Sequence, residues 1–226
     1  MPNPYLKTAT VTFKNVSLEV ASIDQSNMSQ LVAKHYQTFL GQGNIPGPHL
    51  GDPNANVYWL LGNPGGYVPG IPNLVLMNNL TFNAGGNILV NQQYSSHPGF
   101  CWLMKNWKAI INATGSIPDI FTIDYFPFHS KNLQPFMRNP SLLPSYDYYN
   151  TLIDNAINMN KVIVIGRLQS EWMTRVPQLS NYKNLICLKN PRNVALSPGN
   201  MSALEWTMLL NAVQNTTTNN ITPYNP

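Results

Sequence analysis

Polar residues that could do chemistry directly follow each of four short apolar runs. These residues are Asn63, Asp124, Arg167 and Asn190. An amide can orient a water molecule or donate to a developing negative charge, a carboxyl group can exchange a proton, and a guanidinium can bind a phosphate. In open α/β sheets, ligands bind beyond the carboxyl ends of the strands, so these residues would converge if the runs are parallel strands. Because Gly, Pro and Asn are also common turn formers, each cluster taken alone could simply end a strand.

The four apolar runs have the length and composition of β-strands. Together with the polar or turn residues that close them, they are VYWLLGNPGG at 57–66, DIFTIDYFPFHS at 119–130, KVIVIGRLQ at 161–169 and NLICLKNPRN at 184–193. Their continuous apolarity is typical of strands covered on both faces. Segments with helical patterns lie at 29–40, 97–111, 145–160 and 202–214. The sequence therefore predicts an α/β fold of three layers, in which a central four-stranded parallel sheet is flanked by helices.

Local signals place further boundaries. Ser145, with Asp147 in the first turn, is a start signal for the third helical segment, and Ser202 with Glu205 has the spacing of a capping box. Residues 8–20 alternate and predict an edge strand or hairpin, whereas residues 67–96 are rich in Gly, Pro and Asn and predict a long irregular loop. We expect one domain over 1–226, with an N-terminal extension to about residue 25 and a frayed tail over about 215–226.

Composition narrows the classes of function. The net charge of +4 is small for 226 residues and favours a polyanionic partner only weakly. No apolar stretch approaches the roughly 20 residues of a membrane span, so we expect a soluble, cytoplasmic protein without a membrane partner. Cys101 and Cys187 have no CxxC spacing and are interpreted as buried thiols, and the four histidines are scattered. We therefore expect no metal and no cofactor, and the oligomeric state stays open.

The ordered set of motifs over residues 56–200 resembles the uracil-DNA glycosylase superfamily, and is most similar to its mismatch-specific branch. The first motif of that branch, G-x-N-P-G, corresponds here to LGNPG at 61–65, and the second, N-P-S, to NPR at 190–192. Leu61 stands where the family has glycine, and Arg192 where it has serine. Phosphate-loop, G-x-G-x-x-G, G-x-S-x-G and H-E-x-x-H motifs are absent from the sequence.

The resemblance implies a DNA base glycosylase, which hydrolyses the N-glycosidic bond of a damaged or mismatched base flipped out of the DNA stack. Asn63 would position the attacking water, and Asn190, where many relatives carry histidine, would stabilise the departing base. The resemblance also implies a base pocket, with candidates Gly62, Pro64, Gly65, Phe100, Asp124 and Phe128.

Two of these assignments keep an alternative. The phenylalanines could stack on a base or simply belong to the core. An ionised Asp124 accepts N–H groups but cannot donate to a carbonyl, which argues against uracil as the substrate.

Basic and hydroxyl side chains near the strand ends are candidates for contacts with nucleic acid. They are Ser130, Lys131, Arg167, Lys189 and Arg192. Arg192 could grip a phosphate in bidentate fashion or only solvate its loop. The alternative function is a catalytically inactive module that binds a nucleobase, nucleotide or nucleic acid. Leu61 and Asp124 favour this module, whereas Asn63 and Asn190 favour the enzyme.

Overall fold

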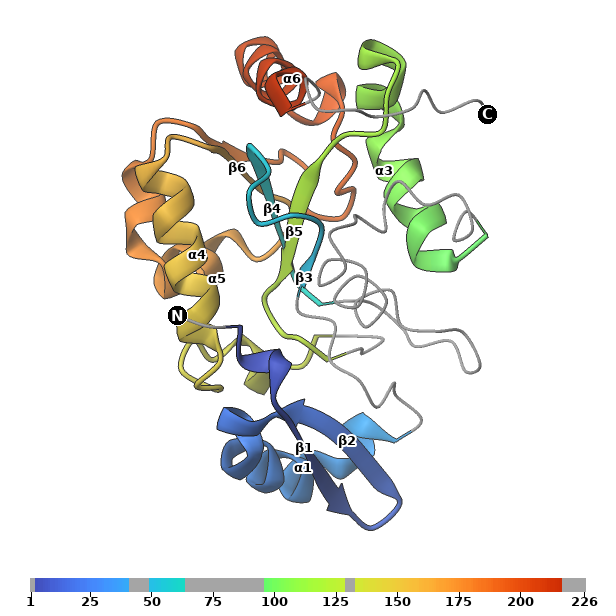
Figure 1. Ribbon diagram of the computed structural model, residues 1–226, viewed down its shortest axis with the longest axis vertical. Helices are drawn as coiled ribbons and strands as arrows, with labels where there is room; N and C mark the ends of the chain where they lie inside the picture. Colours follow the sequence, from blue (N-terminus) through green and yellow to red (C-terminus); the bar gives the residue numbers. More distant parts are fainter. Residues whose placement is uncertain (1–2, 41–48, 64–95, 129–132, 217–226) are drawn as a thin grey trace.

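A five-stranded mixed sheet lies between two layers of helices in the computed structural model, which describes residues 3–40, 49–63, 96–128 and 133–216 (Figure 1). The strand order is β3-β5-β4-β6-β7. The strands are β3 (His49–Leu50), β4 (Val57–Leu61), β5 (Ile120–Asp124), β6 (Val162–Ile165) and β7 (Leu185–Cys187). All four apolar runs form strands that are parallel to one another, as predicted, which confirms the α/β class.

The fifth strand, β3, corrects the expectation of a purely parallel sheet of four strands. It pairs antiparallel with β5 at the edge of the sheet. The Thr122 hydroxyl donates to the Leu50 carbonyl at 3.1 Å. The chain then turns at Gly51, with φ +99°, where a Cβ would lie only 2.5 Å from the Ile120 carbonyl oxygen. Two residues are too few to show a hydrophobic period, so the sequence pattern did not reveal this strand.

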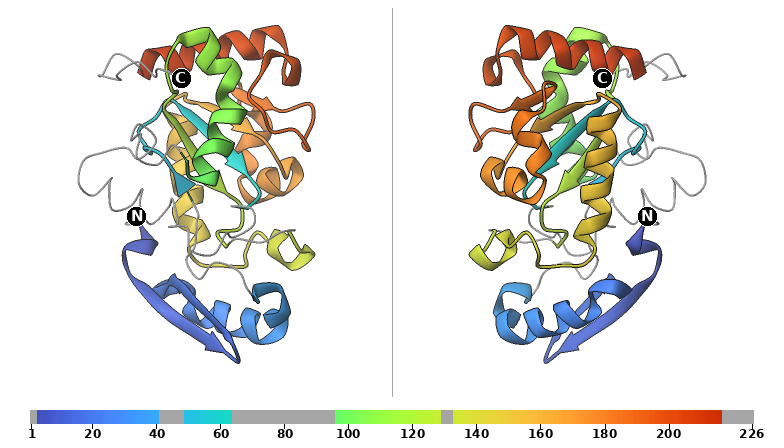
Figure 2. Two further views of the ribbon diagram at one scale, coloured as in Figure 1. Left: turned by 90° about the vertical axis from the view of Figure 1, so that its right-hand side faces the viewer. Right: turned by 90° about the vertical axis from the view of Figure 1, so that its left-hand side faces the viewer.

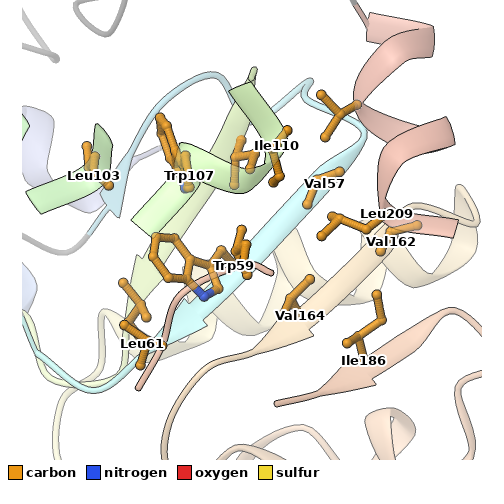
Figure 3. Close-up of a cluster of buried hydrophobic side chains, with 14 of the residues drawn as sticks. Val57, Trp59, Leu61, Leu103, Trp107, Ile110, Val162, Val164, Ile186 and Leu209 are labelled. Carbon is orange, nitrogen blue, oxygen red and sulfur yellow. The ribbon is translucent and has the colours of Figure 1, made fainter. Parts of the chain in front are cut away.

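Helices cover both faces of the sheet because alternate residues of each strand point to opposite sides. α3 (Pro98–Thr114) and α6 (Ala203–Thr216) cover the face that carries Val57, Trp59 and Leu61 (Figure 3). α4 (Tyr146–Asn158) and α5 (Gln169–Arg175) cover the face that carries Tyr58 and Leu60 (Figure 2). All five residues of β4 are buried, as its continuous apolarity predicted.

The helix boundaries test the start signals of the sequence. The capping box is confirmed, since the Ser202 N–H donates to Glu205 Oε2 at 2.6 Å and the Glu205 N–H donates to Ser202 Oγ at 3.3 Å. α4 begins directly after Ser145, but the Ser145 side chain makes no capping hydrogen bond. Its hydroxyl pairs instead with the Tyr5 hydroxyl at 3.2 Å. The helix start was therefore predicted correctly, although the Ser145 side chain makes a tertiary contact in place of a cap.

The N-terminal residues form a small unit beside the sheet. The strands β1 (Thr8–Phe13) and β2 (Val16–Ala21) form the predicted hairpin, and α1 (Gln25–Phe39) packs against it. The apolar core of this unit includes Phe126 and Phe128, which follow β5. The unit therefore lies beyond the carboxyl end of β5, at the bottom of Figure 1.

The short 3₁₀ turns complete the fold. They are η1 (Pro4–Leu6), η2 (Ser22–Asp24), η5 (Pro135–Arg138), η6 (Pro177–Asn181) and η7 (Pro198–Asn200). In the described ranges, no helix has the length and apolar character needed to cross a membrane.

Candidate functional site

Three of the four predicted clusters meet at the carboxyl edge of the sheet. Leu61 is the register partner of Asp124 on β5. The Phe126 N–H donates to the Gly62 carbonyl at 2.9 Å, so the two chains stay paired beyond the strands. A Cβ on Gly62 would lie 3.9 Å from Arg167 Cδ, which places the start of the β6 loop against the first motif. The residues around Gly62, Asp124 and Arg167 therefore form one site.

α5, which the sequence did not reveal, holds the backbone of this edge. The Trp172 indole N–H donates to the Leu61 carbonyl at 2.9 Å, and Tyr125 N–H donates to the same oxygen at 3.2 Å. The Arg175 guanidinium donates to the Tyr125 carbonyl at 3.0 Å. Arg175 is buried among the rings of Tyr125, Tyr146 and Trp172. The two backbone segments that carry Asn63 and Asp124 are thus tied to one short helix.

Asp124 has an unusual carboxyl group. The residue as a whole is only half-buried, but its Oδ1 is fully enclosed and has no hydrogen-bond partner among the described residues. Burial raises the pKa of this carboxyl well above its ordinary value, and the nearby Arg167 guanidinium only partly opposes the rise. This rise favours the neutral form of the carboxyl group up to a higher pH than for an exposed aspartate. Burial thus favours the neutral form of Asp124 over the ionised form on which the argument against uracil rests.

A neutral carboxyl group has both hydrogen-bonding functions. Its O–H donates, and its other oxygen accepts. A side chain of this kind can pair with a carbonyl and an adjacent N–H on one molecule. Asp124 lies on the same face of the sheet as Ile120 and Leu61, since alternate strand residues share a face.

The fourth cluster lies in the loop after β7. The Leu188 N–H donates to the Ile165 carbonyl at 3.1 Å, which places the start of the loop beside the end of β6. Asn190 and Arg192 are exposed. Asn190 Oδ1 accepts the Arg192 N–H at 3.0 Å, in an Asx turn. Within the described part of the chain, Asn190 Nδ2 donates no hydrogen bond, so this N–H group is available to a ligand.

The basic side chains predicted to contact nucleic acid differ in how many hydrogen bonds they already make. Arg167 and Arg192 are exposed, which fits contacts with phosphate groups. The Lys189 ammonium group donates to the Met201 carbonyl at 2.9 Å, so part of its hydrogen-bonding capacity stabilises the loop. Ser130 and Lys131 lie outside the described residues.

The predicted base-binding residues divide into three groups. Gly62 and Asp124 are at the site. Phe100 and Phe128 are 4% and 1% exposed and pack in two separate cores, which favours a structural role for both. Pro64 and Gly65 lie outside the described residues, which end on this side at Asn63.

Metal ligands and thiols add little to this site. No group of three His, Cys, Asp or Glu side chains that could hold a metal ion occurs in the described segments. Cys101 is exposed and Cys187 is half-buried, so the interpretation of both as buried thiols was wrong.

Sequence reasoning missed Trp172, Arg175 and Asn200. The signal available for the first two was an aromatic and a basic residue three positions apart, which share one face of a helix. Asn200 follows Pro198 and Gly199 and has the composition of an ordinary turn.

Comparison with family models, curated proteins and solved structures finds no match to this chain. Its function is therefore inferred from the residues of the site and their geometry.

Proposed function

We propose that this chain is a DNA base glycosylase of the uracil-DNA glycosylase type, which hydrolyses the N-glycosidic bond of a flipped damaged or mismatched base. The observation that carries the proposal is the enclosed Asp124 carboxyl beside Gly62 at the carboxyl edge of the sheet. A buried polar group without a partner is costly unless it serves a ligand.

Asp124 is proposed to read the edge of the base. In its protonated form, the O–H donates to a base carbonyl and the second oxygen accepts from a neighbouring ring N–H. This pattern resembles that of an asparagine side chain. Oxo bases such as uracil therefore fit the neutral form of Asp124, which burial favours over the ionised carboxylate.

Asn63 and Asn190 are proposed to act on the bond itself. The Asn63 amide orients a water molecule whose oxygen bonds to C1′ of the sugar while the C1′–N bond breaks. The base leaves with the bonding electron pair, and the Asn190 amide N–H donates to the negative charge on its carbonyl oxygen. The water gives its spare proton to solvent, and the released base takes one up. Because an amide is a poor proton acceptor, we expect a slow enzyme.

The exposed Arg167 and Arg192 are proposed to bind the phosphates that flank the flipped nucleotide. No cofactor takes part in this scheme.

A second function, base binding without hydrolysis, is favoured by one observation. Leu61, which stands at the glycine position of the family motif, has its side chain in the buried core against α3 and α6. This packing gives the loop that carries Asn63 a different neighbour from the one that a glycine would give.

The test is release of free base from oligonucleotides that contain uracil, hypoxanthine, xanthine or a mismatched thymine, followed by alkaline cleavage of abasic sites. Asn63→Ala should lower the rate by roughly 10² to 10⁴ while DNA affinity changes little. Asn54→Ala is the matched control, because Asn54 is an exposed asparagine in the turn that precedes β4.

The outcomes separate the two functions. Base release that Asn63→Ala reduces and Asn54→Ala leaves intact supports the glycosylase. Binding of a base without release from any substrate supports the binding module. If the wild-type protein neither binds nor releases a base, both functions are excluded.

A further inference from the structure

We infer that Asn200 is a positioning residue. It fixes the backbone of Asn190, so that the side-chain Nδ2 amide of Asn190 stays available to a ligand. This inference rests on the proposed function for the role of Asn190. The hydrogen bonds that carry it are independent of that function.

Asn200 supports the loop after β7 from the inside. Its side chain is almost fully buried, at 3% exposure, although its neighbours Pro198 and Gly199 are exposed. Its Oδ1 accepts the Asn190 N–H at 2.9 Å. Its Nδ2 donates to the carbonyls of Asn193 at 2.5 Å and Ala195 at 3.2 Å. Every polar group of this one side chain is therefore used to hold the loop closed.

The backbone of Asn200 adds to this support. Its carbonyl accepts the Lys189 N–H at 3.0 Å, and its own N–H donates to the Ser197 carbonyl at 2.9 Å. Asn190 and the residue before it are thus joined to the same partner, although ten positions separate Asn190 from Asn200 in the sequence.

As a result, all but one of the polar groups of Asn190 form hydrogen bonds within the loop. Its N–H is held by Asn200, its carbonyl accepts the Asn193 N–H at 3.1 Å, and its Oδ1 accepts the Arg192 N–H. The remaining polar group is the Nδ2 amide. A donor that is fixed before the ligand arrives stabilises developing charge better than one that must reorient, because no ordering cost remains.

Other contacts anchor the ends of the loop but do not fix Asn190. The Leu196 N–H donates to the Asn106 carbonyl on α3 at 2.9 Å, and the Lys189 ammonium group binds the Met201 carbonyl. Loss of the Asn200 side-chain bonds should therefore loosen residues 190–195 while the flanking segments stay attached.

Asn200→Asp is the sharpest variant. The new side chain has the same shape and keeps an oxygen for the Asn190 N–H. In its ionised form, however, it places a second oxygen against the carbonyls of Asn193 and Ala195, where the native amide donates. Asn184→Asp is the matched control, because Asn184 lies at the opposite end of β7 and its Nδ2 also donates to one backbone carbonyl, that of Asn160, at 2.8 Å.

Hydrogen exchange tests the structural step. The backbone N–H groups of Asn190 and Asn193 should exchange at least tenfold faster in Asn200→Asp than in the wild type. In Asn184→Asp their exchange rates should be unchanged. Unchanged exchange of both amides in Asn200→Asp would overturn the inference.

A double-mutant cycle on base release tests the positioning step. Asn190→Ala and Asn200→Asp should each lower the rate by roughly 10² to 10³, the usual effect of losing one donor to a developing negative charge. In the Asn190→Ala background, Asn200→Asp should cause less than a threefold further loss. Equal losses in both backgrounds would show a general structural role and overturn the inference.

The pH dependence gives a third readout. When the introduced carboxyl group of the Asn200→Asp variant is protonated, it can donate again, so this variant should recover activity toward acid pH relative to the wild type. If the wild type releases no base, the proposed function fails, and the exchange result alone decides whether Asn200 fixes Asn190.

Discussion

Each of the two edges of the central sheet encloses a carboxyl group near one basic side chain. The basic side chain is buried at one edge and exposed at the other. At the amino edge, burial and the neighbouring Asp52 raise the pKa of Asp119 to about 6, while Lys161 lowers it. Lys161 is buried, and its ammonium group donates to the Pro53 carbonyl at 3.0 Å. At the carboxyl edge, Asp124 faces Arg167, which is exposed.

This difference separates a structural cluster from a candidate site. The Lys161 ammonium group contacts the Pro53 carbonyl and the Tyr58 ring, so turning toward a ligand would break both contacts. Arg167 forms no hydrogen bond or ion pair within the described ranges and can bind a phosphate without breaking one. A buried acid alone therefore does not mark a site. The carboxyl edge differs in that its cation is exposed.

Among the changes that compare the two edges, removal of the Asp124 carboxyl should have the largest effect. Asp124→Ala should lower base release or base binding by about 10- to 100-fold, since the base loses two hydrogen bonds in an enclosed site. Asp119→Ala should leave both unchanged. Asp124→Asn should retain function because an amide also donates and accepts. Equal losses from Asp124→Ala and Asp119→Ala would erase the functional difference between the edges.

The pH dependence should follow the Asp124 proton. The raised pKa keeps the carboxyl neutral to a higher pH than an exposed aspartate, so activity should fall as pH rises through that pKa, by up to tenfold per unit. Asp124→Asn should lose this alkaline fall, and Asp119→Asn should keep it. Rates measured at saturating substrate between about pH 6 and 10 give the result, and a fall that persists in Asp124→Asn would assign it to another group.

The Asp119 carboxyl at the amino edge should affect the free energy of unfolding. A folded pKa above the unfolded value means that the favourable contribution of the neutral form is complete below about pH 4 and is lost as pH rises through about 6. Asp119→Asn should therefore be more stable than the wild type at pH 7, by about 1 to 2 kcal/mol. Urea unfolding at pH 4 and pH 7 measures this, and an advantage that is the same at both pH values would contradict it.

The smallest expected effect concerns long-range charge. Arg192→Glu should weaken binding to a short oligonucleotide a few-fold and reduce its salt dependence, because one phosphate contact is lost. Lys183→Glu makes the same change of charge on an exposed residue at the amino end of β7 and should have less effect. Similar losses for both variants would indicate that net charge, and not the carboxyl edge, attracts the nucleic acid.

The parts of the fold that were predictable have strong local patterns. Continuous apolarity identified the four parallel strands, alternation identified the hairpin, and the spacing of Ser202 and Glu205 identified the start of α6. α5 has no such pattern, because its seven residues are mostly polar and only Trp172 and Arg175 are buried. Its place in the fold depends on carbonyl groups at positions 61 and 125, which are remote in sequence.

The site was predictable in location but not in its electrostatics. Parallel strands bring their carboxyl ends together, so the positions of Gly62, Asp124 and Arg167 followed from the order of motifs. The protonation of Asp124 depends on what covers it, and the support of Asn190 by Asn200 depends on the path of an irregular loop. Neither can be read from residue types.

The N-terminal hairpin has a consequence for the order of folding. The contacts of β1, β2 and α1 join residues within one stretch of about forty, whereas β4 pairs with β6 across about one hundred intervening residues. Contacts that are close in sequence form sooner, because closing a short loop costs less entropy. The hairpin and α1 are therefore expected to form before the strands of the central sheet pair. Their apolar surface then stays exposed until Phe126 and Phe128 pack against it. This packing of the early unit on the end of β5 is expected to be the last step.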